Sequence, residues 1–216
     1  GLNIRGDQYP YPRSQSSIIG AIFPRWSLSG GREGTLKIMA DEDSRGNLID
    51  GINENIAKGR TPEGLMIGRY SYDESLEGKN ITEIADSMGT TPAEAILRIY
   101  QEGEAWVVIQ SMDEKDVDTF AKHPLIAVAS DGSSMSTEGV LSVGKPHPRS
   151  YGTNPTYIEH FINEKKLVTL QEGIRKMTSL PAERLGLTNR GRLAPGYAAD
   201  IVIMEADKVK SNATFT

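Results

Sequence analysis

The sequence predicts an α/β fold built on a parallel sheet, and two apolar runs carry that prediction. The run from Leu125 to Ala129 is entered through His123-Pro124 and left through Ser130-Asp131-Gly132. A short, wholly apolar run with such borders is typical of a strand that is buried on both faces of a parallel sheet. An earlier run from Trp106 to Gln110 precedes a helix that opens with the capping signal Ser111-Met-Asp-Glu114. The order strand, capped helix, strand is the βαβ pattern, which closes right-handed onto a parallel sheet.

Composition narrows the class of protein. The chain has 216 residues, of which 38% are hydrophobic, so it could bury a core as one domain or as one large piece and a small one. The net charge is −5 and no dense Lys/Arg run occurs, so nothing indicates a nucleic-acid or membrane partner. The apolar stretches are far shorter than the ~20 residues of a transmembrane helix. Zero cysteines exclude disulfides, thiolate metal ligands and a cysteine nucleophile within this chain. We expect a cytoplasmic protein.

The first residues indicate a strand that leaves its sheet. Gly1 to Gly6 is strand-like and resembles the interior of an element, so we expect a fragment whose upstream part is missing. The segment from Asp7 to Arg13 contains two prolines, which deny ladder donors and force extended geometry. Tyr9, Tyr11 and the serines at 14, 16 and 17 are therefore expected on a loop. That loop is either a proline-stiffened surface segment or a place where hydroxyls hold a polar ligand.

The segments at 65–70 and 71–78 hold no cluster with metal-ligand spacing, and the apolar face of the expected helix at 46–57 is more simply part of a core than a cofactor-binding face. Two helix boundaries are clearly signalled. Thr91-Pro92 is an N-cap followed by proline at the first helical position, and Gly89 ends a helix. The expected elements are helices at 35–39, 46–57 and 81–88, a further helix opening at Thr91, and a strand at 65–70.

Asp131 is the first charged residue after the apolar run Leu125–Ala129, and only Ser130 lies between them. At the carboxyl end of a barrel strand, a carboxylate followed by Gly132, Ser133 and a second serine is a candidate catalytic base, because small residues let backbone approach a ligand. Asp-Gly after a strand is also a common turn, and that alternative stays open. The proline-stiffened His147-Pro-Arg149 segment forms either a surface ion pair or a rim in which Arg149 pairs with an anionic substrate.

The last third of the chain contains clear signals for the starts and ends of helices. Helices are expected to begin at Asn154-Pro155, at Thr169 and at Pro181, the last ending at Gly186. The period then changes, and the pattern from Gly191 to Met204 predicts a turn between two short strands. A small β unit is predicted at the chain end.

Five motifs together resemble the N-acyl-D-amino-acid deacylases of the amidohydrolase superfamily. They are Asp7-Gln-Tyr-Pro-Tyr11, Ser130-Asp-Gly132, His147-Pro-Arg149 with Tyr151-Gly-Thr153, Met177-Thr-Ser-Leu-Pro-Ala-Glu-Arg-Leu-Gly186, and Gly196-Tyr-Ala-Ala-Asp-Ile-Val202. The resemblance extends from Asp7 to Phe215.

The resemblance implies that the chain is the C-terminal part of a (β/α)₈ TIM-type barrel with the last strands of a small β domain. The barrel part would take residues 1–188, with an insertion at about 18–105, and the β domain would take 189–216. It implies zinc-dependent hydrolysis of N-acyl-D-amino acids, with Asp131 as general base and acid. Tyr9, Tyr11, Arg149 and Ser133 are the implied substrate-binding residues.

The same residues leave two alternatives open. One is a cyclic amidohydrolase of dihydroorotase or hydantoinase type, which shares the carboxylate after the last strand; Asp7-Gln-Tyr-Pro-Tyr11 argues against it. The other is a non-catalytic fragment that needs a partner chain. The family's metal ligands are expected upstream, in the other half of the same protein, so that this segment alone holds no zinc and is inactive. Its three histidines, at 123, 147 and 160, form no His-x-His pair.

Overall fold

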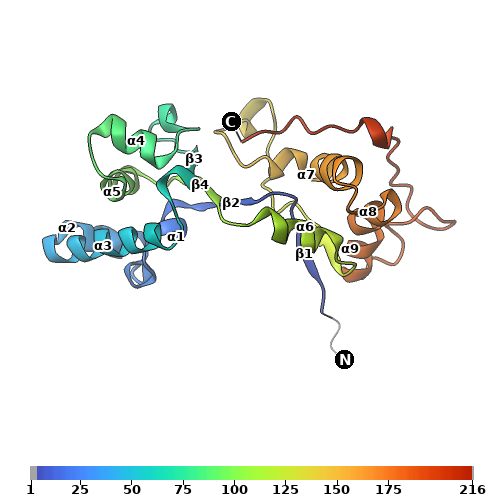
Figure 1. Cartoon of the computed structure of the whole chain (residues 1–216), viewed down its shortest axis with the longest axis horizontal. Coiled ribbons are helices and arrows are strands. Elements are labelled where there is room, and N and C mark those ends of the chain that lie inside the picture. The colour runs from blue at the N-terminus through green and yellow to red at the C-terminus, as the bar shows by residue number, and fades with distance from the viewer. Residues whose placement is uncertain (1–3, 216) are drawn as a thin grey trace. The chain divides into compact units, whose positions relative to one another are not determined.

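The computed structural model describes residues 4–215, which divide into two compact units. Unit 1 comprises the chain up to Pro12 together with residues 112–136 and 148–214. Unit 2 comprises residues 13–111 and 137–147, with the chain end from Phe215. Helices and strands occur in both (Figure 1), so the predicted α/β class is confirmed, whereas a complete eight-stranded barrel stays a prediction.

The sheet of unit 1 has two parallel strands, β1 (Gly6–Gln8) and β5 (Ile126–Val128). Gly6 pairs with Ile126 and Gln8 with Val128. The parallel pairing predicted for the central strand is confirmed. The prediction that it is buried on both faces is wrong, because only Ala127 is buried and its two strand neighbours are half-buried. Part of the strand predicted at the start of the chain, residues 1–3, lies outside the described residues.

The helices of unit 1 form a small core. They are α6 (Glu114–Lys122), α7 (Arg149–Tyr157), the π-helix η5 (Ile158–Glu164), α8 (Leu170–Met177), α9 (Ser179–Arg184) and the short 3₁₀-helix η6 (Ala206–Lys208). The core cluster consists of Val117, Ala121, Tyr157, Phe161 and Val168.

Three predicted helix starts in unit 1 differ from the structure. The helix expected from Pro181 begins two residues earlier, at Ser179. Asp113, rather than Ser111, caps α6 by accepting a bond from the backbone of Lys115. The helix expected from Asn154 begins earlier, at Arg149, because Pro148 already has helical backbone angles. The cap at Thr169 is as predicted, since its hydroxyl accepts from the backbone of Glu172.

The end of unit 1 contains no strand between residues 189 and 214, all of which the structure describes. The two short strands predicted from Gly191 to Met204 are therefore not formed. A strand is defined by hydrogen bonds to a neighbour, and no strand among residues 4–215 pairs with this segment. Ile201, Val202 and Ile203 are exposed as a result. Assignment of 189–216 to a β domain stays a prediction.

Unit 2 contains an antiparallel sheet in the order β2-β4-β3. Its strands are β2 (Arg13–Ser17), β3 (Leu65–Arg69) and β4 (Trp106–Gln110). Two predictions fail in this sheet. The serines expected on a loop lie in β2, because β4 supplies backbone partners for it. The βαβ unit is also wrong, since β4 and β5 belong to different sheets.

The helices of unit 2 bury one large apolar cluster against this sheet, which includes Ile18, Leu48, Ile67, Ile96 and Val107. They are α1 (Ile18–Ile22), α2 (Gly31–Ala40), α3 (Glu42–Ala57), α4 (Ile81–Met88) and α5 (Pro92–Glu102), with 3₁₀-helices η1 (Arg25–Leu28), η2 (Pro62–Gly64), η3 (Glu74–Leu76) and η4 (Gly139–Leu141). The predicted cap at Thr91 and the left-handed Gly89 are both confirmed. The whole of 18–105 lies in this unit; that it is an insertion into a barrel stays a prediction.

Candidate functional site

Four of the five candidate site residues lie at or just beyond the carboxyl edge of the two-stranded sheet of unit 1. Tyr9 directly follows β1, and Asp131 follows β5 by three residues. Because the strands are parallel, their carboxyl ends share one edge, and the loops that follow them meet there. Arg149 at the start of α7 reaches both residues. This is the predicted location of Asp131, at the carboxyl end of a parallel strand.

Arg149 connects the two loops. Its Nη2 lies 2.8 Å from Oδ2 of Asp131, and its Cζ lies 4.7 Å from the centre of the Tyr9 ring. The Arg149 side chain is 8% exposed and that of Asp131 is 69% exposed. A guanidinium held against an aromatic face gains from both charge and stacking. The arginine is thus fixed, and the carboxylate that it holds remains accessible to water.

The phenol of Tyr9 responds to this environment. Burial raises the pKa of Tyr9, and the Asp131 carboxylate raises it further. The charge of Arg149 and its hydrogen bond to the phenol lower the pKa but do not cancel the rise. Tyr9 therefore stays a neutral phenol near neutral pH, able to donate a hydrogen bond.

The loop after β5 is held in an unusual backbone conformation. Asp131 has φ of 48°, the left-handed region that is uncommon outside glycine and that Asp and Asn tolerate best. A Cβ at Gly132 would lie 2.9 Å from Cα of Ser150 and 3.1 Å from the carbonyl oxygen of Arg149. Only glycine therefore lets this loop pack directly on the first turn of α7. Strained backbone of this kind is frequent at functional sites.

Side-chain hydroxyls hold the loop in place. The backbone N–H of Gly132 donates to Oγ of Ser130 at 3.2 Å, and the N–H of Ser133 donates to Oγ of Ser150 at 3.3 Å. The candidate residue Ser133 is exposed and joins the group through its backbone. Sequence reasoning missed Ser150; its only signal was a hydroxyl directly after the Pro148-Arg149 helix start.

Tyr11 lies elsewhere in unit 1. It is 6% exposed, and its hydroxyl is 2.9 Å from Oγ1 of Thr156 in α7. Burial raises its pKa, while hydrogen bonds with Thr156 and Ser211 lower it. The hydroxyl therefore serves the interior of the unit in this structure, and a substrate-binding role for Tyr11 stays a prediction.

His147, which the sequence placed beside Arg149 on a rim, is fully buried in unit 2. Its Nε2 lies 2.9 Å from the carbonyl oxygen of Arg13. The prediction that His147 lies at the rim of the site is wrong, because its ring is buried and contacts the backbone of Arg13 in β2.

A zinc site does not fit the residues that the structure describes. Among residues 4–215, no group of three His, Cys, Asp or Glu side chains could hold a metal ion. His123 accepts from the backbone N–H of Leu125, and Nδ1 of His160 lies 2.6 Å from Glu164.

Among residues 4–215, no helix is both long and apolar enough to span a bilayer.

Comparison with known proteins adds to this geometry. The model of the amidohydrolase family matches residues 35–214. The N-acyl-D-aspartate deacylase of Alcaligenes xylosoxydans xylosoxydans is 34% identical over 152 residues, which is 70% of this chain and 28% of that protein. The N-acyl-D-glutamate deacylase of the same organism is 35% identical over 138 residues, or 64% of this chain and 26% of that protein.

Solved structures of related deacylases also align with this chain. An N-acyl-D-glutamate deacylase from Bordetella bronchiseptica, complexed with zinc and a phosphonate mimic of the tetrahedral intermediate, aligns with a TM-score of 0.72 and 26% identity. That alignment covers 100% of this chain and 36% of the other. A D-aminoacylase structure at 24% identity and a TM-score of 0.69 shares the fold. The matched part spans 28% of the N-acyl-D-aspartate deacylase and 36% of the Bordetella bronchiseptica structure, so the chain corresponds to a minor part of these relatives. The chain belongs to the amidohydrolase family.

Proposed function

We propose that this chain is part of an N-acyl-D-amino-acid deacylase, a hydrolase that cleaves the amide bond between the acyl group and the amino acid. The observation that carries the proposal is the assembly of Asp131, Arg149 and Tyr9 at the carboxyl edge of parallel strands. Similarity to three relatives named for this chemistry supports it.

In this proposal Asp131 handles the proton. An exposed carboxylate at the mouth of a parallel sheet can accept a proton from the attacking water and return it to the leaving nitrogen. Arg149 contacts one oxygen, Oδ2, and so fixes the direction in which the carboxylate points. The same residue then serves as base and as acid.

Arg149, Tyr9 and Ser133 bind the substrate in this proposal. The guanidinium matches the planar α-carboxylate of an N-acyl amino acid, and the neutral phenol and serine hydroxyl donate hydrogen bonds to its polar groups. For Tyr11, a buried supporting role agrees better with its contact to Thr156.

We further propose that the complete protein uses zinc and takes the ligands from outside this chain. This chain covers 36% of the zinc-bound relative, and residues 4–215 offer no metal site. The rest of the same protein is then the partner that supplies the zinc ligands. This chain alone hydrolyses no N-acyl amino acid.

The test is an assay of the complete protein with zinc on the N-acetyl derivatives of D-glutamate, D-aspartate and D-leucine and on their L enantiomers. We expect acetate release from one or more D compounds and none from this chain alone. Hydrolysis of a hydantoin or dihydroorotate instead of these amides would assign a cyclic amidohydrolase. A complete protein that cleaves neither class contradicts the proposal and favours a non-catalytic role.

A further inference from the structure

Lys176 is fully buried, which is rare for a lysine. It lies in the last turn of α8 and is 0% exposed. Burial lowers its pKa, the Glu172 carboxylate raises it, and the charge of Arg175 lowers it. Removing an ammonium group from water is unfavourable unless hydrogen bonds replace the water, so such a residue needs specific partners.

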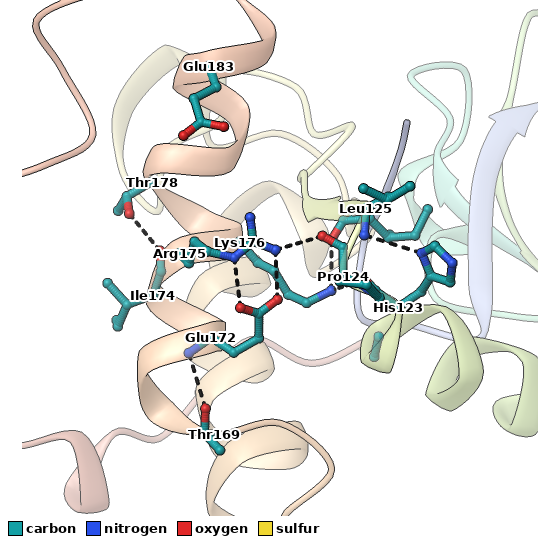
Figure 2. A network of polar contacts seen from close by, with 12 residues as sticks. His123, Pro124, Leu125, Thr169, Glu172, Ile174, Arg175, Lys176, Thr178 and Glu183 are labelled. Carbon is teal, nitrogen blue, oxygen red and sulfur yellow. Dashed lines mark hydrogen bonds and ion pairs between the residues drawn. The ribbon is translucent and has the colours of Figure 1, made fainter. Parts of the chain in front are cut away.

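The partners of Lys176 are backbone carbonyls at the entrance to β5. Nζ donates to the carbonyl oxygens of His123 and Ile126, the latter at 2.9 Å. Figure 2 shows Lys176 and Arg175 extending from α8 toward the segment that carries His123, Pro124 and Leu125. The lysine therefore bridges the end of α6 and the first residue of β5.

Arg175 adds a second attachment to the same segment. Its Nη2 donates to the carbonyl oxygen of Pro124 at 2.6 Å, while Glu172 holds the guanidinium through both carboxylate oxygens, at 2.7 and 2.8 Å. The carbonyl of Leu125 receives the backbone N–H of Gly6 in β1. The successive carbonyls from residue 123 to residue 126 are thus each bound by a donor from α8 or β1.

β5 needs such an attachment because its own pairing is short. Within residues 4–215, three residue pairs join it to β1, so few ladder hydrogen bonds hold its register. A slip of one residue shifts a strand by about 3.3 Å and turns its side chains to the opposite face. Asp131, three residues beyond the strand, would then lose its contact with Arg149.

We propose that Lys176 is a positioning residue, which fixes the start and register of β5 and thereby the place of Asp131. The proposal rests on the deacylase function proposed above only for its effect on activity. The attachment of β5 can be measured without any substrate.

The experiment uses the complete protein and compares Lys176→Met with two controls. Lys122→Met changes an exposed lysine in the last turn of α6. Tyr157→Phe removes the buried bond from the Tyr157 hydroxyl to the Ala121 carbonyl in α6, which destabilises the same unit without removing a hydrogen bond to β5. Hydrogen exchange in peptides covering 126–129 is followed well below the melting temperature, and kcat and KM are measured for each variant.

In Lys176→Met, we expect exchange at 126–129 to quicken by about tenfold or more, and kcat to fall by about tenfold to a hundredfold with KM within about threefold of wild type. Both controls should leave exchange and kcat near wild type. If the methionine variant does not fold, Lys176→Gln, which retains an N–H donor, takes its place in both measurements.

Unchanged exchange at 126–129 in the folded lysine variant contradicts the proposal. The proposal is also contradicted if Tyr157→Phe and Lys176→Met lower the melting temperature equally and also lower kcat equally. Lys176 would then act on activity through stability alone. A wild-type protein without deacylase activity overturns the proposed function instead, and the exchange result still decides the role of Lys176 in holding β5.

Discussion

Nη2 of Arg149 lies 2.8 Å from Oδ2 of Asp131, and this contact joins a nearly buried cation to an exposed carboxylate. The loop that carries Asp131 is fixed on the same helix, because Gly132 packs on the backbone of Ser150. Such a pair holds the carboxylate in one orientation while leaving its other side to solvent and ligand.

Replacing Arg149 with lysine tests whether the shape of the guanidinium matters. Arg149→Lys keeps the charge but loses the planar fork and the stacking on Tyr9. A charge-assisted bond is worth roughly 1.5–3 kcal/mol, so kcat/KM of the complete protein should fall about 10- to 100-fold. The matched control is Arg190→Lys, a more exposed arginine paired with Asp200, which should leave the steady-state rates unchanged. Equal activity of the two variants would remove Arg149 from the site.

Tyr11 and Tyr9 should respond differently to loss of the hydroxyl. Tyr11→Phe removes a buried bond to Thr156, so it should cost about 1 kcal/mol of stability and leave KM nearly unchanged. Tyr9→Phe removes a donor at the proposed site and should raise KM with little change in melting temperature. Thermal unfolding and steady-state kinetics separate the two effects. A large rise in KM for Tyr11→Phe without loss of stability would restore its predicted role in substrate binding.

Gly132 should tolerate no side chain. Gly132→Ala places a Cβ 2.9 Å from backbone at Ser150, so the loop must move away from α7 and carry Asp131 with it. We expect a loss of activity of about tenfold or more. Gly46→Ala in α3 is the control, since nothing lies within 4 Å of its Cβ and alanine favours a helix. Wild-type kinetics in Gly132→Ala would show that the loop is not fixed by this contact.

The ion pair of Glu172 and Arg175 should affect stability at acid pH. The hydrogen bonds from Arg175 lower the pKa of Glu172, so the unfolded chain binds more protons between the folded pKa and the ordinary value. The stabilisation is therefore complete above the unfolded pKa and is lost as pH falls through the folded pKa. Glu172→Gln keeps the capping arrangement with Thr169 and should cost about 0.5–1 kcal/mol at pH 7. Melting curves of both proteins from pH 7 downward should converge; a constant difference contradicts this explanation.

Local signals in the sequence predicted local structure well. The capping hydroxyls of Thr91 and Thr169 and the left-handed Gly89 are where the sequence indicated, because these features depend on a few neighbouring residues. The placement of Asp131 after a parallel strand was also correct.

Pairing between distant segments could not be predicted in the same way. The run Trp106–Gln110 is compatible with a buried strand in either sheet, and the apolar pattern alone does not say that its partners are β2 and β3 instead of β5. The bonds of Lys176 to carbonyls 50 and 53 residues away have no local signal, since the helical pattern of α8 does not reveal which face is buried against β5.

The role of Asp131 is the central claim, and one substitution in the complete protein tests it. Asp131→Asn keeps the size of the side chain and tolerates the left-handed backbone equally well, but the amide cannot accept a proton from water near neutral pH. Asp86→Asn, at an exposed position in α4, is the control. With the melting temperature and zinc content of each variant near wild type, kcat of Asp131→Asn should fall by roughly 10²–10⁴, the usual contribution of general acid–base catalysis. A kcat within about threefold of wild type would contradict the claim and leave Asp131 as a turn residue.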